Sequence, residues 1–250
     1  MTDRHLSMKT FFIHIAKDDG FMIGTLINVA AILAGTALGL LLRRGIPERM
    51  RDTVMQGLGL CVILIGVSGA LKTADTMCVI VSIVAGGLLG SAVNIEHRLN
   101  QLGDLAERKL VHGSGGSSFA KGFVTASLVY CVGAMAIVGA MDSGLRGDHS
   151  TLIAKAALDG VSAIFFASTM GVGVGLSALA VLVYQGAIAL LAGWLSPLLT
   201  DAVINEMSAV GGLLIIGIGL NMLYDKHLSV GNLLPAIFIP MAYLPLSALF

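Results

Sequence analysis

The longest apolar stretch of this chain runs from residue 152 to residue 194 and contains only two charged side chains, Lys155 and Asp159. At a helical rise of about 1.5 Å per residue, it would cover about twice the ~30 Å hydrocarbon thickness of a bilayer. The stretch must therefore cross the membrane and fold back. We expect the break within residues 169–175, where alternating glycines remove the side chains that favour a straight helix. These glycines are Gly171, Gly173 and Gly175.

The composition also indicates a membrane protein. Hydrophobic residues make up 56% of the chain, charged residues 12%, and the mean hydropathy is +0.90, whereas a soluble domain has about 25% charged residues. The net charge of zero gives no indication of nucleic-acid binding. The three cysteines lie in apolar runs without metal-ligand spacing, and known catalytic signatures are missing. We therefore expect no enzyme activity, no cofactor and no metal site.

Eight apolar segments are long enough to cross a bilayer, and they must be helices because irregular backbone cannot face lipid. The predicted fold is an all-α polytopic membrane protein with eight spans. They are Met22–Leu42, Val54–Leu71, Thr76–Asn94, Gly122–Met141, Thr151–Thr169, Val172–Leu195, Glu206–Tyr224 and Gly231–Phe250.

Residues 22–250 are predicted to form a single membrane domain, which includes a surface segment at 95–121. Charged residues and leucines interleave over Ile95–Leu110 as in an amphipathic helix, and a Gly/Ser-rich linker, Gly113–Ser118, follows. Residues 1–21 form an N-terminal extension outside this domain. Their basic residues fit poorly with the orientation predicted below, so we interpret Met22 as the functional start. A disordered tail or a tail on the membrane surface would leave the same pattern.

The distribution of basic residues predicts the orientation. Arginines crowd the connection after the first span, between Arg43 and Arg51, and further basic residues follow the third span, up to Lys121. Both connections should be cytoplasmic, because cytoplasmic loops carry an excess of Lys and Arg. Both ends of an eight-span chain then lie on the outer side of the membrane.

The chain resembles itself at a shift of about 150 residues. Ile46-Pro47 aligns with Ser196-Pro197, and the Gly-rich segment 57–66 resembles 210–217. Spans one to three therefore correspond to spans six to eight. Because five spans separate the partners, the two copies have opposite orientations in the membrane. Such an inverted repeat is the architecture of transporters that open alternately to either side.

Polar residues within the spans are candidates for a binding site. Lys155, Asp159, Ser162 and Thr169 fall on one face of the fifth span. The Lys–Asp pair could hold an anionic or zwitterionic substrate or exchange a proton as Asp159 is neutralised, or it could be a structural ion pair that fixes this span against its neighbours. Further candidates in other spans are the single amides and the carboxylate of Asn28, Gln185, Glu206, Asn221 and Asn232, and for each of them an interhelical contact is favoured over a ligand role.

Prolines and glycines mark further special positions. The last span contains Pro235, Pro240 and Pro245, which should leave the carbonyls of Gly231, Ala236 and Met241 without helical partners, as at a broken binding helix or a simple kink. The small-residue pairs Gly35/Gly39 and Gly86/Gly90 predict a homodimer, since close backbone approach drives helix association in lipid.

Four segments together carry a family resemblance: residues 23–28, 139–159, 208–213 and 232–236. With them the chain resembles the bacterial inner-membrane family called domain of unknown function 554, over residues 22–250. The resemblance implies a multispanning, transporter-like protein of the inner membrane and no particular substrate. We therefore expect a secondary transporter or exchanger of a small polar solute. The alternative is a channel-like or purely structural membrane protein.

Overall fold

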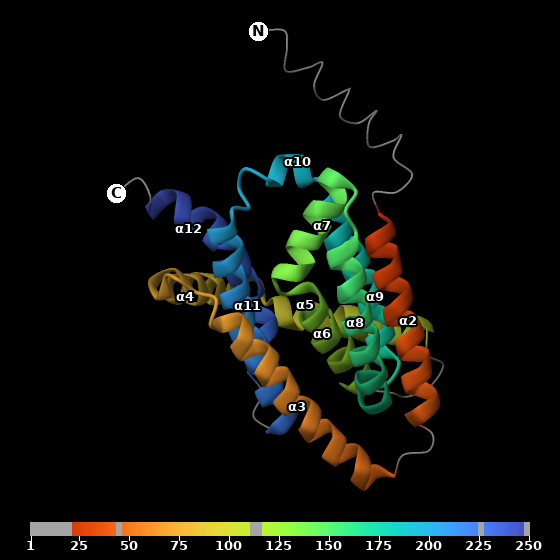
Figure 1. Cartoon of the computed structure of the whole chain (residues 1–250). Coiled ribbons are helices and arrows are strands. Elements are labelled where there is room, and N and C mark those ends of the chain that lie inside the picture. The colour runs from red at the N-terminus through yellow and green to blue at the C-terminus, as the bar shows by residue number, and fades with distance from the viewer. Residues whose placement is uncertain (1–21, 44–46, 111–116, 225–227, 248–250) are drawn as a thin grey trace.

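A computed structural model describes residues 22–43, 47–110, 117–224 and 228–247, in which all regular elements are helical (Figure 1). The helices are α2 (Ile23–Arg43), α3 (Glu48–Ala70), α4 (Thr76–Val93), α5 (Ile95–Leu110), α6 (Ser117–Cys131), α7 (Ala134–Arg146), α8 (Ser150–Met170), α9 (Gly173–Leu190), α10 (Ala192–Leu195), α11 (Asp201–Leu223), the 3-10 helix η1 (Val230–Phe238) and α12 (Pro240–Ser247). Within these residues seven spans are long and apolar enough to cross a membrane, and the number is eight when the bent pair α6–α7 is counted as one span. The predicted all-α polytopic fold is confirmed.

Three spans begin well before their apolar segments. α3 starts at Glu48 instead of Val54, α6 starts at Ser117 instead of Gly122, and α11 starts at Asp201 instead of Glu206. At α11 the Thr200 side chain accepts a hydrogen bond from the Val203 N–H (3.3 Å), which caps the helix. Hydropathy marks the part of a helix that lies in lipid, whereas at α11 the cap marks where the helix begins.

The helices form two groups. The first bundle contains α2, α6, α7, α8 and α9, and the second contains α3, α4, α11 and η1. In the first bundle α2 and α8 run in the same direction, with Gly35 against the Gly160 carbonyl and Gly39 against the Ile164 carbonyl. A side chain at either glycine would overlap backbone, so these glycines permit the close approach of the two helices.

In the second bundle α3 and α11 are antiparallel and equally close. Gly59 lies against Gly219, and Gly66 lies against Gly212. α4 packs in the same antiparallel manner on η1, where Gly86 contacts Ala236 and Gly90 contacts Asn232. Each helix of the second bundle therefore approaches its partner through glycine.

The fourth predicted span, Gly122–Met141, is wrong as one continuous helix. It is divided between α6 and α7, which are bent by 63°. The break contains Gly133, whose φ of +127° is disfavoured for every residue with a side chain. The apolar pattern continues through the break and so gives no sign of it.

The bent pair still follows α9 from end to end. Phe119 at the start of α6 contacts Gly173 at the start of α9, and Gly144 in α7 contacts Ala189 in the last turn of α9. α6 and α7 therefore cover the same depth as α9, which favours one broken span over a re-entrant loop.

α8 and α9 are separated within the predicted range 169–175. α8 ends at Met170, and Gly171 has a φ of +88°, a conformation that favours glycine. Gly173 begins α9, and Gly175 packs against Thr36 of α2. A hinge function of these glycines stays a prediction.

The last span is discontinuous, as its prolines suggest. Pro235 lies inside η1, and Pro240 is the first residue of α12, where the missing N–H has no cost. The expectation of a free carbonyl at Ala236 is wrong, because this carbonyl accepts a hydrogen bond from Ile239 N–H (3.2 Å). The change to 3-10 geometry replaces the lost helical partner.

The glycine pairs from which we predicted a homodimer are used within the chain. Gly35 and Gly39 contact α8, and Gly86 and Gly90 contact η1. These faces therefore provide no support for association between chains. A homo-oligomer stays a prediction.

The basic connections lie at one end of the molecule. Arg43 contacts Gly171 at the end of α8, and Lys121 Nζ lies 3.5 Å from the Asn221 carbonyl near the end of α11. The predicted amphipathic range is helix α5. Of the predicted linker, Ser117 and Ser118 already belong to α6 and the remainder lies outside the described residues, as does the extension 1–21.

Candidate functional site

Helix α8 carries a buried ion pair. Lys155 and Asp159 lie one helical turn apart, each is 6% exposed, and Lys155 Nζ donates a hydrogen bond to Asp159 Oδ2. Asp159 is the tenth residue of this 21-residue spanning helix, close to its middle. An unpaired charge near mid-bilayer costs about 2.5–3.5 kcal/mol even on the most lenient scale. Pairing reduces that cost for both groups.

Two amides from neighbouring helices extend the pair. Asn28 of α2 donates from Nδ2 to Asp159 Oδ2 (3.0 Å) and to Gln185 Oε1 of α9 (3.4 Å). Both amide side chains are fully buried. We call Asn28, Lys155, Asp159 and Gln185 the polar cluster; it joins three spans that are far apart in the sequence.

The polar cluster has unused hydrogen-bonding capacity. Asn28 Oδ1 and Gln185 Nε2 are buried without a partner among the described residues. Leaving a buried donor or acceptor unpaired costs about 1–3 kcal/mol, so such atoms commonly bind water or a ligand. Both hydrogen bonds that Asp159 accepts within the described part of the chain go to Oδ2, which leaves Oδ1 available as an acceptor.

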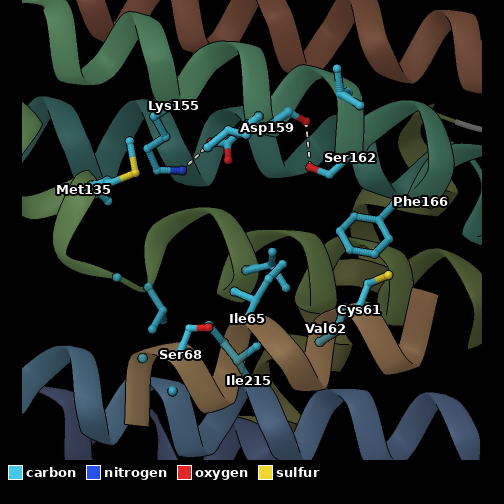
Figure 2. A pocket seen from close by; sticks show the side chains of 18 of the residues that line it. Cys61, Val62, Ile65, Ser68, Met135, Lys155, Asp159, Ser162, Phe166 and Ile215 are labelled. Carbon is cyan, nitrogen blue, oxygen red and sulfur yellow. Dashed lines mark hydrogen bonds and ion pairs between the residues drawn. The ribbon is translucent and has the colours of Figure 1, made fainter. Parts of the chain in front are cut away.

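A cavity of about 1020 Å³ lies beside the ion pair, between the two bundles. Figure 2 shows Lys155, Asp159 and Ser162 of α8 on one wall, and Cys61, Val62, Ile65 and Ser68 of α3 on the opposite wall. Residues of α7 and α11, including Met135 and Ile215, complete the lining. One small polar area therefore faces a wall that is mainly apolar.

An aromatic residue lies close to the ammonium group. Lys155 Nζ is 5.9 Å from the ring centroid of Tyr130 in α6, within the range of a cation–π interaction. The Tyr130 ring in turn packs against Phe166, with 6.2 Å between centroids. These rings fix the position of the lysine head group at the edge of the cavity.

The four residues predicted to share a face of α8 divide into two sets. Lys155, Asp159 and Ser162 line the cavity. The Ser162 hydroxyl donates to the Asp159 backbone carbonyl (3.0 Å). Thr169 is near the other end of the helix, where its hydroxyl donates to the carbonyls of Phe165 (3.1 Å) and Phe166 (3.0 Å).

Glu206 lies apart from the polar cluster. Its carboxylate accepts hydrogen bonds from the Thr73 hydroxyl (2.7 Å) and from the backbone N–H groups of Ala74 (2.7 Å) and Asp75 (3.1 Å). These donors form the turn between α3 and α4. Glu206 therefore anchors this turn to α11, which agrees with a packing role.

The two remaining predicted residues also bind backbone. Asn221 makes two hydrogen bonds of 2.8 Å with the N–H and carbonyl of Leu228. Asn232 accepts the Glu96 N–H (2.9 Å), and the Glu96 carboxylate accepts the Gly231 N–H (3.1 Å). Both asparagines connect segments at helix ends.

Sequence reasoning missed part of the site. Gln185 was only one amide among several, and neither Tyr130 nor the α3 wall was a candidate. No spacing in the sequence connects positions 28, 130, 155 and 185, because helix packing alone brings them together. Gln185, which is the one amide in the mainly apolar α9, was the available signal.

The helices and the buried charge pair define this chain as a polytopic helical membrane protein. Residues 23–244 match the family described as "Protein of unknown function (DUF554)", and the chain belongs to this family, as the resemblance implied.

Two relatives from distant bacteria cover nearly the whole chain. One is the "Uncharacterized membrane protein YdfK" of Bacillus subtilis (strain 168), 35% identical over 223 residues, which cover 88% of this chain and 94% of the relative. The other is the "Uncharacterized protein YqgA" of Escherichia coli (strain K12), 34% identical over 230 residues, which cover 91% and 97%. No solved structure matches the chain.

Proposed function

We propose that this protein is a secondary transporter or exchanger of a small polar solute in the bacterial inner membrane, working by alternating access. The observation that carries the proposal is the Lys155–Asp159 pair at the edge of the cavity. Ionisable residues inside spans commonly mark solute or proton pathways. A cavity of about 1020 Å³ has ample room for a small solute, since ligand pockets typically measure about 300–1,000 Å³.

The arrangement of the helices supports an inverted repeat. α9 begins 150 residues after α2, α11 begins 153 residues after α3, and η1 begins 154 residues after α4. Each of these pairs is in contact and antiparallel. Antiparallel pairing of equivalent helices is expected around a two-fold axis in the membrane plane.

The glycines of α3 and α11 support the same axis. A shift of 153 residues takes Gly59 to Gly212 and Gly66 to Gly219. Gly59 contacts Gly219 while Gly66 contacts Gly212, so exchanging the two copies reproduces the same pair of contacts. Motion of one bundle against the other would open the cavity between them to alternate sides.

The alternative function is structural or channel-like. It is favoured by the hydrogen bonds of Asn28, which join α2, α8 and α9 and would hold these spans together without any solute. A permanently open channel and a closed structural protein make opposite predictions about access to the cavity. Measuring access to the cavity from each side of the membrane therefore distinguishes a transporter, a channel and a structural protein.

The test uses a single cysteine in place of Ser162, in a chain whose Cys61, Cys78 and Cys131 are replaced. An impermeant thiol reagent is applied to sealed right-side-out and inside-out vesicles. The transporter should be labelled from either side, without a leak of small ions. The matched control is a cysteine in place of Leu88 of α4, which is 70% exposed toward lipid and should not be labelled.

Labelling from neither side would support the structural reading, and labelling accompanied by an ion leak would support a channel. A second measurement follows uptake into proteoliposomes. The proteoliposomes are given a mixture of small metabolites, and mass spectrometry should find at least one that accumulates in a saturable, gradient-dependent manner.

A further inference from the structure

We infer that the cavity binds a zwitterionic solute with an apolar body, its ammonium group at Asp159 and its acid group at Lys155. The chemistry is shared by apolar amino acids and by zwitterionic lipids such as phosphatidylethanolamine. The inference rests on the proposed function for its biological purpose. Binding itself is measurable without transport.

The charge of the site selects the head group. Lys155 and Asp159 together carry no net charge, and both face the cavity. A solute with one net charge would leave that charge uncompensated in an apolar surrounding, which is costly. The other charged residue that lines the cavity, Lys72, lies just beyond the C-terminal end of α3 and is exposed.

The free atoms of the pair match such a head group. Asp159 Oδ1 accepts no hydrogen bond from the described residues, and Lys155 Nζ has further N–H groups beyond the one that it donates to Oδ2. Oδ1 can therefore accept from an ammonium group while Nζ donates to a carboxylate or phosphate. The positions of both atoms are fixed, since Asn28 holds the carboxylate and Tyr130 lies beside the ammonium group.

The opposite wall selects the body of the solute. Val62 and Ile65 of α3 face the ion pair across the cavity, and most of the remaining lining is apolar. An apolar body gains free energy by leaving water for this wall, whereas a polar body would lose its hydrogen bonds there. A head group without such a body, as in glycine, should bind weakly.

The test compares a matched series of compounds by their effect on the thermal unfolding midpoint of the purified full-length protein. The series is phenylalanine, 3-phenylpropanoate, which lacks the ammonium group, 2-phenylethylamine, which lacks the carboxylate, glycine, which lacks the apolar body, and dihexanoyl-phosphatidylethanolamine. Phenylalanine, the short-chain lipid or both should raise the midpoint and bind at least tenfold tighter than the other three. Their order identifies an amino acid or a lipid as the source of the head group.

Charge-changing variants sharpen the test. Asp159→Asn leaves a positive site and should shift preference at least tenfold toward 3-phenylpropanoate, whereas Lys155→Met should shift it toward 2-phenylethylamine. A purely structural pair would change stability without changing this order. Ile65→Trp places a larger side chain opposite the ion pair and should weaken the ligand effect, while its control Ile80→Trp, on the exposed face of α4, should retain it.

Equal stabilisation by a singly charged compound would overturn the inference, as would the absence of stabilisation by both phenylalanine and the short-chain lipid. Binding of a zwitterion without any transport would refute the proposed function and leave the inference standing. Transport of a solute with one net charge would refute the inference and leave the proposed function standing.

Discussion

At the scale of single residues, the pairing of Lys155 and Asp159 determines how much stability the protein loses by burying these two charges. Removing one partner of a buried pair costs about 3–5 kcal/mol, because the remaining charge loses its compensation. Replacing both partners with apolar residues is often neutral for stability. A structural pair and a solute site therefore differ most clearly in the double variant.

We predict that Lys155→Ala and Asp159→Ala each abolish uptake and lower the stability of the protein. The double variant Lys155→Met/Asp159→Leu should recover stability, since no unpaired charge remains, but not uptake. Thermal unfolding and proteoliposome uptake are measured for all three. Full uptake by the double variant would reduce the pair to a structural role.

Glu206 serves a different purpose from the polar cluster, because all three of its hydrogen-bond donors belong to the turn before α4. Glu206→Ala should lower the free energy of unfolding by about 2–3 kcal/mol, as expected when hydrogen bonds to a buried charged group are lost. The control variant is Asp201→Ala, which removes an exposed carboxylate from the same helix. The thermal unfolding of the two variants is compared. A loss of ligand binding at unchanged stability would instead assign Glu206 to a site.

At the scale of helices, glycines do two different things in this molecule. Gly35, Gly66 and Gly212 allow close packing, since a side chain there would meet neighbouring backbone. Gly133 and Gly171 interrupt helices through positive φ angles. The second class determines the path of the chain, because it turns α6 into α7 and separates α8 from α9.

We predict that Gly133→Ala destabilises the protein by about 1–3 kcal/mol through backbone strain alone. An added methyl group would meet nothing within 4 Å, so no steric clash contributes. The control is Gly57→Ala, which also has open space but lies within α3 and should stabilise by up to about 1 kcal/mol. Equal thermal midpoints for both variants would contradict the bent structure at Gly133.

At the scale of the whole molecule, the packing of the helices brings both basic connections to one end. Arg43 meets the break after α8, and α6 begins beside the start of α9. This arrangement is a requirement of the predicted orientation, in which both connections are cytoplasmic.

We predict that a cysteine at Gln101 of α5 is labelled only from the cytoplasm and one at Ser196 only from outside. Both positions are exposed, and a background without the three native cysteines removes other targets. An impermeant reagent applied to intact cells and to inside-out vesicles provides the measurement. Labelling of both from the same side would contradict the inverted repeat together with the orientation.

The sequence by itself determined the class of fold and most of the spans, because apolar length in lipid requires helices. It also placed the break near Gly171, since repeated glycines are a local property of the chain. It failed at Gly133, where the apolar pattern is continuous and one backbone angle divides the span. The sequence around a single glycine does not show which φ angle that glycine adopts.

Only the tertiary structure decided which polar residues meet. Asp159, Asn28 and Gln185 lie in three helices, and their contact depends on the close approach of α2 to α8 through Gly35 and Gly39. Glu206 was an equal candidate in the sequence, yet packing turns it toward the α3–α4 turn. A charge in a span has to find a partner because lipid offers none, but helix packing determines whether that partner is a side chain, a backbone turn or a solute.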